Sequence, residues 1–202
     1  MMVNKKKSNK KFSLRKEYKK SWNYLKESKR FIWIVIGIFL AFALIGFFIP
    51  VPEIVSKQIF EFIKEILGKT EGMSQSRLIS FIFLNNIQSS FLGMVFGVFL
   101  GIFPLISAIA NGYLLGFVAN FAIQENGILS LWRILPHGIF ELPAVFISFA
   151  LGLRIGASLF NKKRFRKFNE NFVSCLKVFV LIVIPLLIIA AIIEGTLISL
   201  GA

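Results

Sequence analysis

Aspartate is absent from this chain of 202 residues, and cysteine and histidine occur once each. A lone cysteine forms no disulfide within the chain, so the class of disulfide-stabilised small proteins is excluded. Only 17% of the residues are charged, whereas about a quarter is usual in a soluble domain. Intrinsic disorder is excluded because 56% of the residues are hydrophobic. The sequence therefore describes an ordered chain that is unusually apolar.

Positive charge is concentrated in two segments. Residues 1–30 contain twelve Lys or Arg and two Glu, a net charge of +10, and residues 161–177 contain six and one, a net charge of +5. A basic tail could also bind nucleic acid, but a nucleic-acid reader does not need long apolar runs beside it. We therefore expect the lipid bilayer, and no nucleic acid, as the surroundings of this chain.

The apolar residues form runs long enough to cross a membrane as helices, which takes about twenty residues. The uncharged run 78–123 is too long for one crossing and fits two, divided near Gly101 and Pro104. A membrane β-barrel would need alternating polar and apolar residues, which these runs lack. We predict a basic tail (1–30) and an all-α membrane domain (31–200) with five spans. The predicted spans are 31–49, 78–100, 104–123, 137–160 and 176–200.

The orientation follows from the rule that positively charged loops stay in the cytoplasm. The two basic segments are then cytoplasmic, which requires an odd number of spans, an inside N-terminus and an outside C-terminus. Residues 53–67 read as an amphipathic helix outside the membrane, either resting on the bilayer surface or packed on the spans. Residues 128–135 are apolar but too short to span, so we expect a re-entrant or interfacial segment there.

Small residues recur every fourth position in the spans. The candidate helix-packing residues are Gly93, Gly97 and Gly101 in the second span and Gly112 and Gly116 in the third. Glycines with this spacing form a groove along which two helix backbones approach closely. Because a tight turn joins the two spans, we expect their grooves to face each other.

Polar residues inside the spans form the candidate functional cluster, because such residues are costly in lipid and usually face the bundle interior. The predicted topology puts Glu141 and Glu194 roughly 7 Å and 9 Å from the same outer surface at 1.5 Å per helical residue. Three interpretations stay open: a structural polar network, a pocket or pathway for an ion or polar ligand, and a metal site. The cluster comprises Asn86, Asn120, His137, Glu141 and Glu194.

Catalysis has little support in the sequence. One His and two Glu could ligate zinc with an open position, but the paired histidines of an HExxH motif are absent. Walker, GxSxG and dinucleotide-binding motifs are absent too. We assign no catalytic residue, cofactor or metal, and the question of an enzymatic activity stays open with a non-enzyme favoured.

The segment LPHGIFELPAVFIS at residues 135–148 resembles the stage II sporulation protein M family, whose hallmark is a Pro-His-Gly-x-x-Glu-x-Pro-Ala stretch. The pairs Asn85-Asn86 and Asn111-Gly112 and the stretch AAIIEGTLI around Glu194 match further elements of that family. The resemblance implies a five-helix membrane protein of bacteria or archaea. The founding member works in the septal engulfment machinery of spore formers, where it anchors peptidoglycan-degrading partners.

The favoured function is that of an integral scaffold or anchor in a membrane- or envelope-remodelling complex of the prokaryotic cell membrane. The alternative is a transporter or channel that uses the outer polar cluster, and an intramembrane metal hydrolase comes third. Membrane-protein partners and a homo-oligomer both fit the sequence, which identifies neither.

Overall fold

The computed structural model describes residues 13–133, 135–160 and 164–200, without the side chains of residues 132–137 and 164–167. Every regular element in these ranges is helical. The α-helices are α1 (Leu14–Glu27), α2 (Lys29–Phe48), α3 (Glu53–Thr70), α4 (Gln75–Val95), α5 (Ile102–Asn126), α6 (Leu135–Ser158), α7 (Arg164–Val178) and α8 (Ile184–Ser199). The shorter segments are the 3-10 turns η1 (Phe96–Val98) and η2 (Ile128–Arg133) and the π-helical η3 (Phe179–Val183).

Five helices of the described residues are long and apolar enough to cross a membrane, which confirms the predicted all-α bundle of five spans. Their ranges are Lys29–Phe48, Gln75–Val98, Ile102–Asn126, Gly138–Ser158 and Phe168–Ser199. The helix of the fifth span begins well before the predicted start at residue 176, because α7, η3 and α8 are continuous. The prediction took the start of the apolar run, just after the basic residues, as the start of the span. The helix itself extends back through the basic residues to Arg164.

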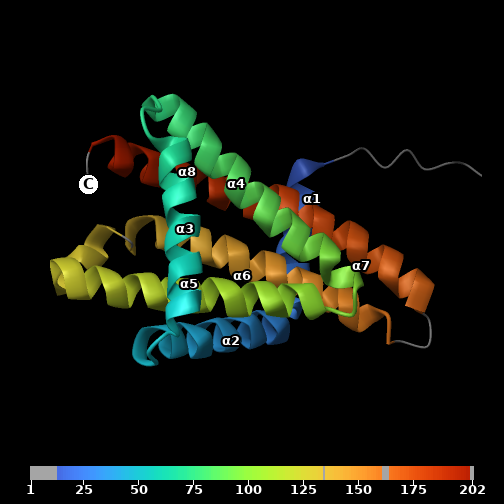
Figure 1. Ribbon diagram of the computed structural model, residues 1–202. Helices are drawn as coiled ribbons and strands as arrows, with labels where there is room; N and C mark the ends of the chain where they lie inside the picture. The colour runs from blue at the N-terminus through green and yellow to red at the C-terminus, as the bar shows by residue number, and fades with distance from the viewer. Residues whose placement is uncertain (1–12, 134, 161–163, 201–202) are drawn as a thin grey trace, which may run out of the picture.

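The long helices lie side by side, and α3 crosses them (Figure 1). α2 packs along α5, and α4, α6 and α8 pack against one another, with α6 also contacting α2 and α5. The turn between η1 and α5 and the start of α7 lie at one end of the bundle, while the C-terminal ends of α2, α5 and α8 lie at the other (Figure 1). We call these the inner and outer ends, after the predicted topology.

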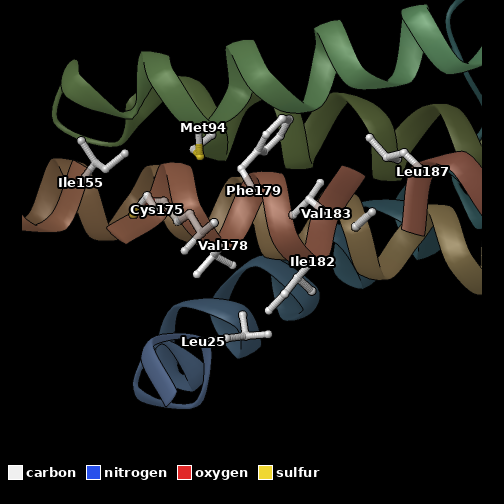
Figure 2. Close-up of a cluster of buried hydrophobic side chains, with 11 residues drawn as sticks. Leu25, Met94, Ile155, Cys175, Val178, Phe179, Ile182, Val183 and Leu187 are labelled. Atoms are coloured by element: carbon white, nitrogen blue, oxygen red, sulfur yellow. The ribbon is translucent and has the colours of Figure 1, made fainter. Parts of the chain in front are cut away.

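The main core is built around the continuous helix α7–η3–α8 (Figure 2). Met94 of α4 and Ile155 of α6 are completely buried against it, and Leu25 brings α1 into the same cluster. Cys175 is also completely buried in this core. The core therefore joins the surface helix α1 to three of the spans.

Glycines allow the closest helix contacts, but not between the helices that we expected. A Cβ atom on Gly97 would lie 2.5 Å from Cα of Gly152 on α6, and one on Gly116 would lie 2.8 Å from the Ala43 carbonyl carbon on α2. The expectation that the grooves of the second and third spans face each other is therefore wrong. A short connection fixes only the adjoining ends of two helices, so each groove is free to pack on another helix that fits it.

The break between the second and third spans lies at Gly101, as the sequence predicts. Leu100 and Gly101 have φ values of 57° and 77°, in the left-handed region. Glycine reaches this region without the steric cost of a Cβ atom. The reversal allows α5 to start at Ile102, and Pro104 is tolerated in its first turn, where a missing N–H breaks no helical hydrogen bond.

The helix α3 combines both environments that we considered for the amphipathic segment. Phe60 packs edge-on against Phe117 and Phe121 of α5, with ring centroids 5.5 Å and 4.8 Å away. Ile54 and Phe62 remain exposed, at 74% and 50%. One side of α3 is thus attached to the spans, and apolar side chains remain available to the bilayer or to a partner.

The segment before α6 is a short 3-10 helix, η2, rather than a span. Ser130 holds it to the end of α5, because its hydroxyl donates to the carbonyl of Ala122 at 2.9 Å. Ile128 and Leu129 are exposed at 71% and 80%. The segment is thus too short to span, and its interfacial position stays a prediction.

Candidate functional site

Two glutamates from different spans lie near the outer end of the bundle. Glu141 lies in the second turn of α6, and Glu194 lies five residues before the end of α8. The two helices pack together, and the carboxyl groups are close enough for their charges to interact. We call Glu141 and Glu194 the acidic pair.

Helix α4 completes the surroundings of Glu194. The neighbouring Gly195 packs directly on Ile79, since a Cβ atom there would lie 3.1 Å from Cα of Ile79. One residue further, the Thr196 hydroxyl accepts a hydrogen bond from the Gln75 amide at 3.1 Å. The Glu194 atom Oε2 is buried and has no hydrogen-bond partner among the described residues. A buried, unpaired carboxyl oxygen is costly, so this site has capacity for a further donor.

Glu141 also borders a groove of about 560 Å³ between α2, α5 and α6. The groove is lined mostly by apolar side chains, and its polar contributions come from Glu141 and Asn111. Asn111 donates its amide back to the Ser107 carbonyl at 2.8 Å, which leaves its oxygen free to accept. A carboxyl group and an amide oxygen thus lie beside a largely apolar surface.

Asn120 belongs to a different part of the surface. It is nine residues after Asn111, about two and a half turns of a helix with 3.6 residues per turn, and therefore lies on the opposite side of α5. Its side-chain oxygen accepts a hydrogen bond from Gln124 at 2.8 Å, and it lines a second groove, of about 340 Å³, next to Phe60 of α3. Asn120 is thus not brought to the acidic pair. Asn86 is half-buried on α4.

The side chain of His137 lies outside the described residues, although its backbone belongs to α6. The predicted contact between this imidazole and the acidic pair therefore stays a prediction. Among the side chains that the structure does describe, no three His, Cys, Asp or Glu come together in a metal-binding group. A metal at the acidic pair would need His137 or an external ligand as its third donor.

A second polar cluster, at the inner end of the bundle, was not predicted from the sequence. The Arg154 guanidinium donates to the Tyr24 carbonyl at 3.0 Å, the Ser28 hydroxyl at 2.7 Å and the Glu27 carboxylate at 3.1 Å. It also lies over the Tyr24 ring, 3.7 Å from the centroid. The positive charge is thus satisfied at the point where α1 joins α2. An arginine inside an apolar run was the signal, because such a residue needs a partner.

The same cluster ties α1 to α7. The Tyr24 hydroxyl donates to the Asn171 side-chain oxygen at 3.0 Å and lies 3.5 Å from the Cys175 sulfur. Burial raises the pKa of the Tyr24 phenol far above its usual range, so the hydroxyl stays protonated. Lys177 pairs with Glu17 at 2.6 Å on the surface. We call the contacts of Arg154, Tyr24 and Glu17 the inner clamp.

Two archaeal proteins are similar to this chain in sequence. An uncharacterized protein of Methanocaldococcus jannaschii, MJ0706, is 30% identical over 173 residues, which cover 83% of this chain and 77% of the relative. A second uncharacterized protein of that archaeon, MJ0793, is 35% identical over 119 residues, covering 56% of this chain and 66% of the relative. No solved structure matches the chain significantly.

The family comparison covers all five spans, at least in part. Residues 35–197 match the family described as stage II sporulation protein M. The match contains the acidic pair, the close glycine contacts and the Pro-His-Gly stretch at the start of α6. This multi-pass membrane protein therefore belongs to the stage II sporulation protein M family.

Proposed function

We propose that this protein is a membrane scaffold or anchor in a membrane- or envelope-remodelling complex. The observation that supports this most is the fixed attachment of the surface helix α1 to a tightly packed bundle, together with a second helix, α3, that touches the bundle lightly and has no buried residue. α1 is held by the inner clamp, and α3 contacts α5 through Phe60. Both helices still expose large side chains, with Trp22 at 43% and Phe62 at 50%. A packed bundle that presents two such surfaces suits the positioning of other proteins.

The proposal includes an orientation and a location. The net charge of +10 over residues 1–30 favours α1 in the cytoplasm, and the odd number of spans then puts α3 and the acidic pair outside. The archaeal relatives support a prokaryotic cell membrane as the location.

Photo-crosslinking in native membranes tests the scaffold. A photoreactive residue at Trp22 or Phe62 should capture the same protein repeatedly, identified by mass spectrometry, when the chain is expressed at its normal level. The same residue at Leu44, which is 58% exposed on α2, serves as the control and should capture mainly lipid. Capture of lipid alone at both surface helices would contradict the scaffold.

One observation favours a second candidate, a transporter that binds a ligand at the acidic pair. Glu141 borders the 560 Å³ groove on one side and interacts with Glu194 on the other. The test measures uptake of a solute into proteoliposomes that contain the purified protein. Uptake that is lost in Glu141→Gln and kept in Glu125→Gln would support transport. Glu125 is the matched control because it is an exposed glutamate near the outer end of α5.

A further inference from the structure

Helix α4 exposes polar side chains in the middle of its span. Asn85, Gln88 and Ser89 are exposed and lie near the centre of the 24-residue segment Gln75–Val98. Ile82 and Gly93, which are buried, lie on the side that faces the bundle. We call Asn85, Gln88 and Ser89 the α4 polar face.

Lipid tails cannot satisfy this face. An amide side chain has two N–H donors and an oxygen that accepts, and hydrocarbon offers no partner for any of them. No described residue forms a hydrogen bond with the side chain of Asn85 or Gln88. Asn111 on α5 is also exposed, but its amide bonds to its own helix. The α4 polar face therefore differs from an ordinary lipid-facing surface.

The outward faces of two other spans provide the comparison. α2 exposes Leu40 and Leu44, and α8 exposes Ile188 and Ile192, all of them apolar. These faces need no protein partner in a bilayer. Among α2, α4 and α8, only α4 has an outward face that needs a protein partner.

We propose that the α4 polar face packs against the same face of a second copy of this chain. Two copies inserted in the same orientation are related by a two-fold axis along the membrane normal, and each residue near that axis meets its own counterpart at the same depth. A second copy therefore always supplies an amide where the first copy needs one. Amides are self-complementary, since each is both donor and acceptor.

The side chains around the polar face fit a helix–helix contact. Ser89 is small and lies one turn from Asn85, which allows two helices to approach closely. Leu84 and Leu92, exposed at 61% and 38%, add apolar surface beside the amides. Amides at a membrane helix interface also fix which faces meet, because a rotated pairing would leave them unsatisfied. The proposal concerns assembly and holds whether the protein acts as a scaffold or as a transporter.

Disulfide crosslinking in native membranes tests the contact directly. Cys175 is the single cysteine of the chain and is buried, so a Cys175→Ala background leaves one introduced thiol as the only reactive position. Gln88→Cys should give a covalent dimer on oxidation, and Leu40→Cys on the lipid face of α2 should not. A photoreactive residue at position 88 gives the same readout with Cys175 in place, should the background variant fold poorly.

A substitution tests the amides themselves. Asn85→Leu combined with Gln88→Leu should weaken dimerisation roughly tenfold or more, as expected for losing interhelical hydrogen bonds on both sides of the axis. Leucine suits lipid, so the variant should still insert and fold as a monomer. Ile188→Leu with Ile192→Leu on α8 is the matched control and should dimerise normally.

Three outcomes decide the question. A dimer crosslinked through position 88 supports the proposal, provided that a thiol placed at Leu92 instead crosslinks in the otherwise unchanged chain and loses the crosslink in the double leucine variant. Equal crosslinking at positions 88 and 40 overturns it. Crosslinking of position 88 only to a different protein also overturns it and would identify the α4 polar face as the docking site of that protein. None of these results depends on partner capture at α1 or α3, so failure here is distinguishable from failure of the scaffold.

Discussion

The contact between Gly97 and α6 gives the sharpest test of the packing. A Cβ atom on Gly97 would lie 2.5 Å from both the carbonyl carbon and Cα of Gly152. Carbon atoms in contact are normally about 3.5–4.0 Å apart, so Gly97→Ala has to push the two backbones apart by about 1 Å. Neither side can yield by changing a rotamer, because both are backbone. Overpacking of this kind typically costs about 1–3 kcal/mol.

The measurement is thermal unfolding of the purified protein in one detergent. For a chain of this size each 1 kcal/mol shifts Tm by about 2–4 °C, so we expect Gly97→Ala to melt several degrees lower than the wild type. Gly37→Ala is the matched control, since a Cβ atom there meets nothing within 4 Å. That variant should melt at or slightly above the wild-type temperature, because alanine favours the helix over glycine by about 1 kcal/mol. Equal Tm values for Gly97→Ala and Gly37→Ala would refute the close contact.

Three further predictions concern the inner clamp and the topology. Arg154→Met should release α1 and expose it to proteolysis while the spans stay folded, since hydrogen bonds to a charged group contribute about 1.5–3 kcal/mol each. The control Arg77→Met, at an exposed arginine, should leave the proteolysis of α1 unchanged. The α1–α7 contact should weaken as the pH falls from about 4.5 towards 2, because hydrogen bonds from Lys177 and Lys20 lower the pKa of Glu17 from 4.5 to about 2. Hydrogen exchange of the α1 amides measures this weakening, and Glu17→Gln should remove its dependence on acid pH. Reporters fused after residues 160 and 200 should lie on opposite sides of the membrane, and a shared side would contradict five crossings.

The number of spans could be predicted from the sequence because one physical quantity, the thickness of the hydrocarbon layer, sets the length of an apolar run. The division at Gly101 was predictable for a similar reason, since a reversal between helices needs a residue that tolerates positive φ. Which helices touch was not predictable. The glycine spacing shows that a helix has a groove, but the partners, α6 for Gly97 and α2 for Gly116, depend on the shape of the whole bundle.

For the polar residues, too, one part of the arrangement was predictable from the sequence and another part was not. From the predicted topology and the helical rise we expected Glu141 and Glu194 at similar depth, and both lie near the same end of the bundle on helices that pack together. Depth says nothing about the direction in which a side chain points. Asn120, which we expected in the cluster, therefore lines a different groove. Arg154 reaches partners more than a hundred residues away in the sequence, and no local pattern identifies such a contact.

The acidic pair offers the clearest separation between a structural and a functional role. If the two carboxyl groups act as one unit, the effects of Glu141→Gln and Glu194→Gln should not add, because removing either charge already removes their interaction. A purely structural pair would show this non-additivity in the melting temperature alone. A functional pair would keep the melting temperature of at least one glutamine variant near the wild type and still lose the cellular role, with Glu125→Gln unaffected in both. Additive effects on both readouts would show that the two glutamates act independently, and the acidic pair would then not be a site.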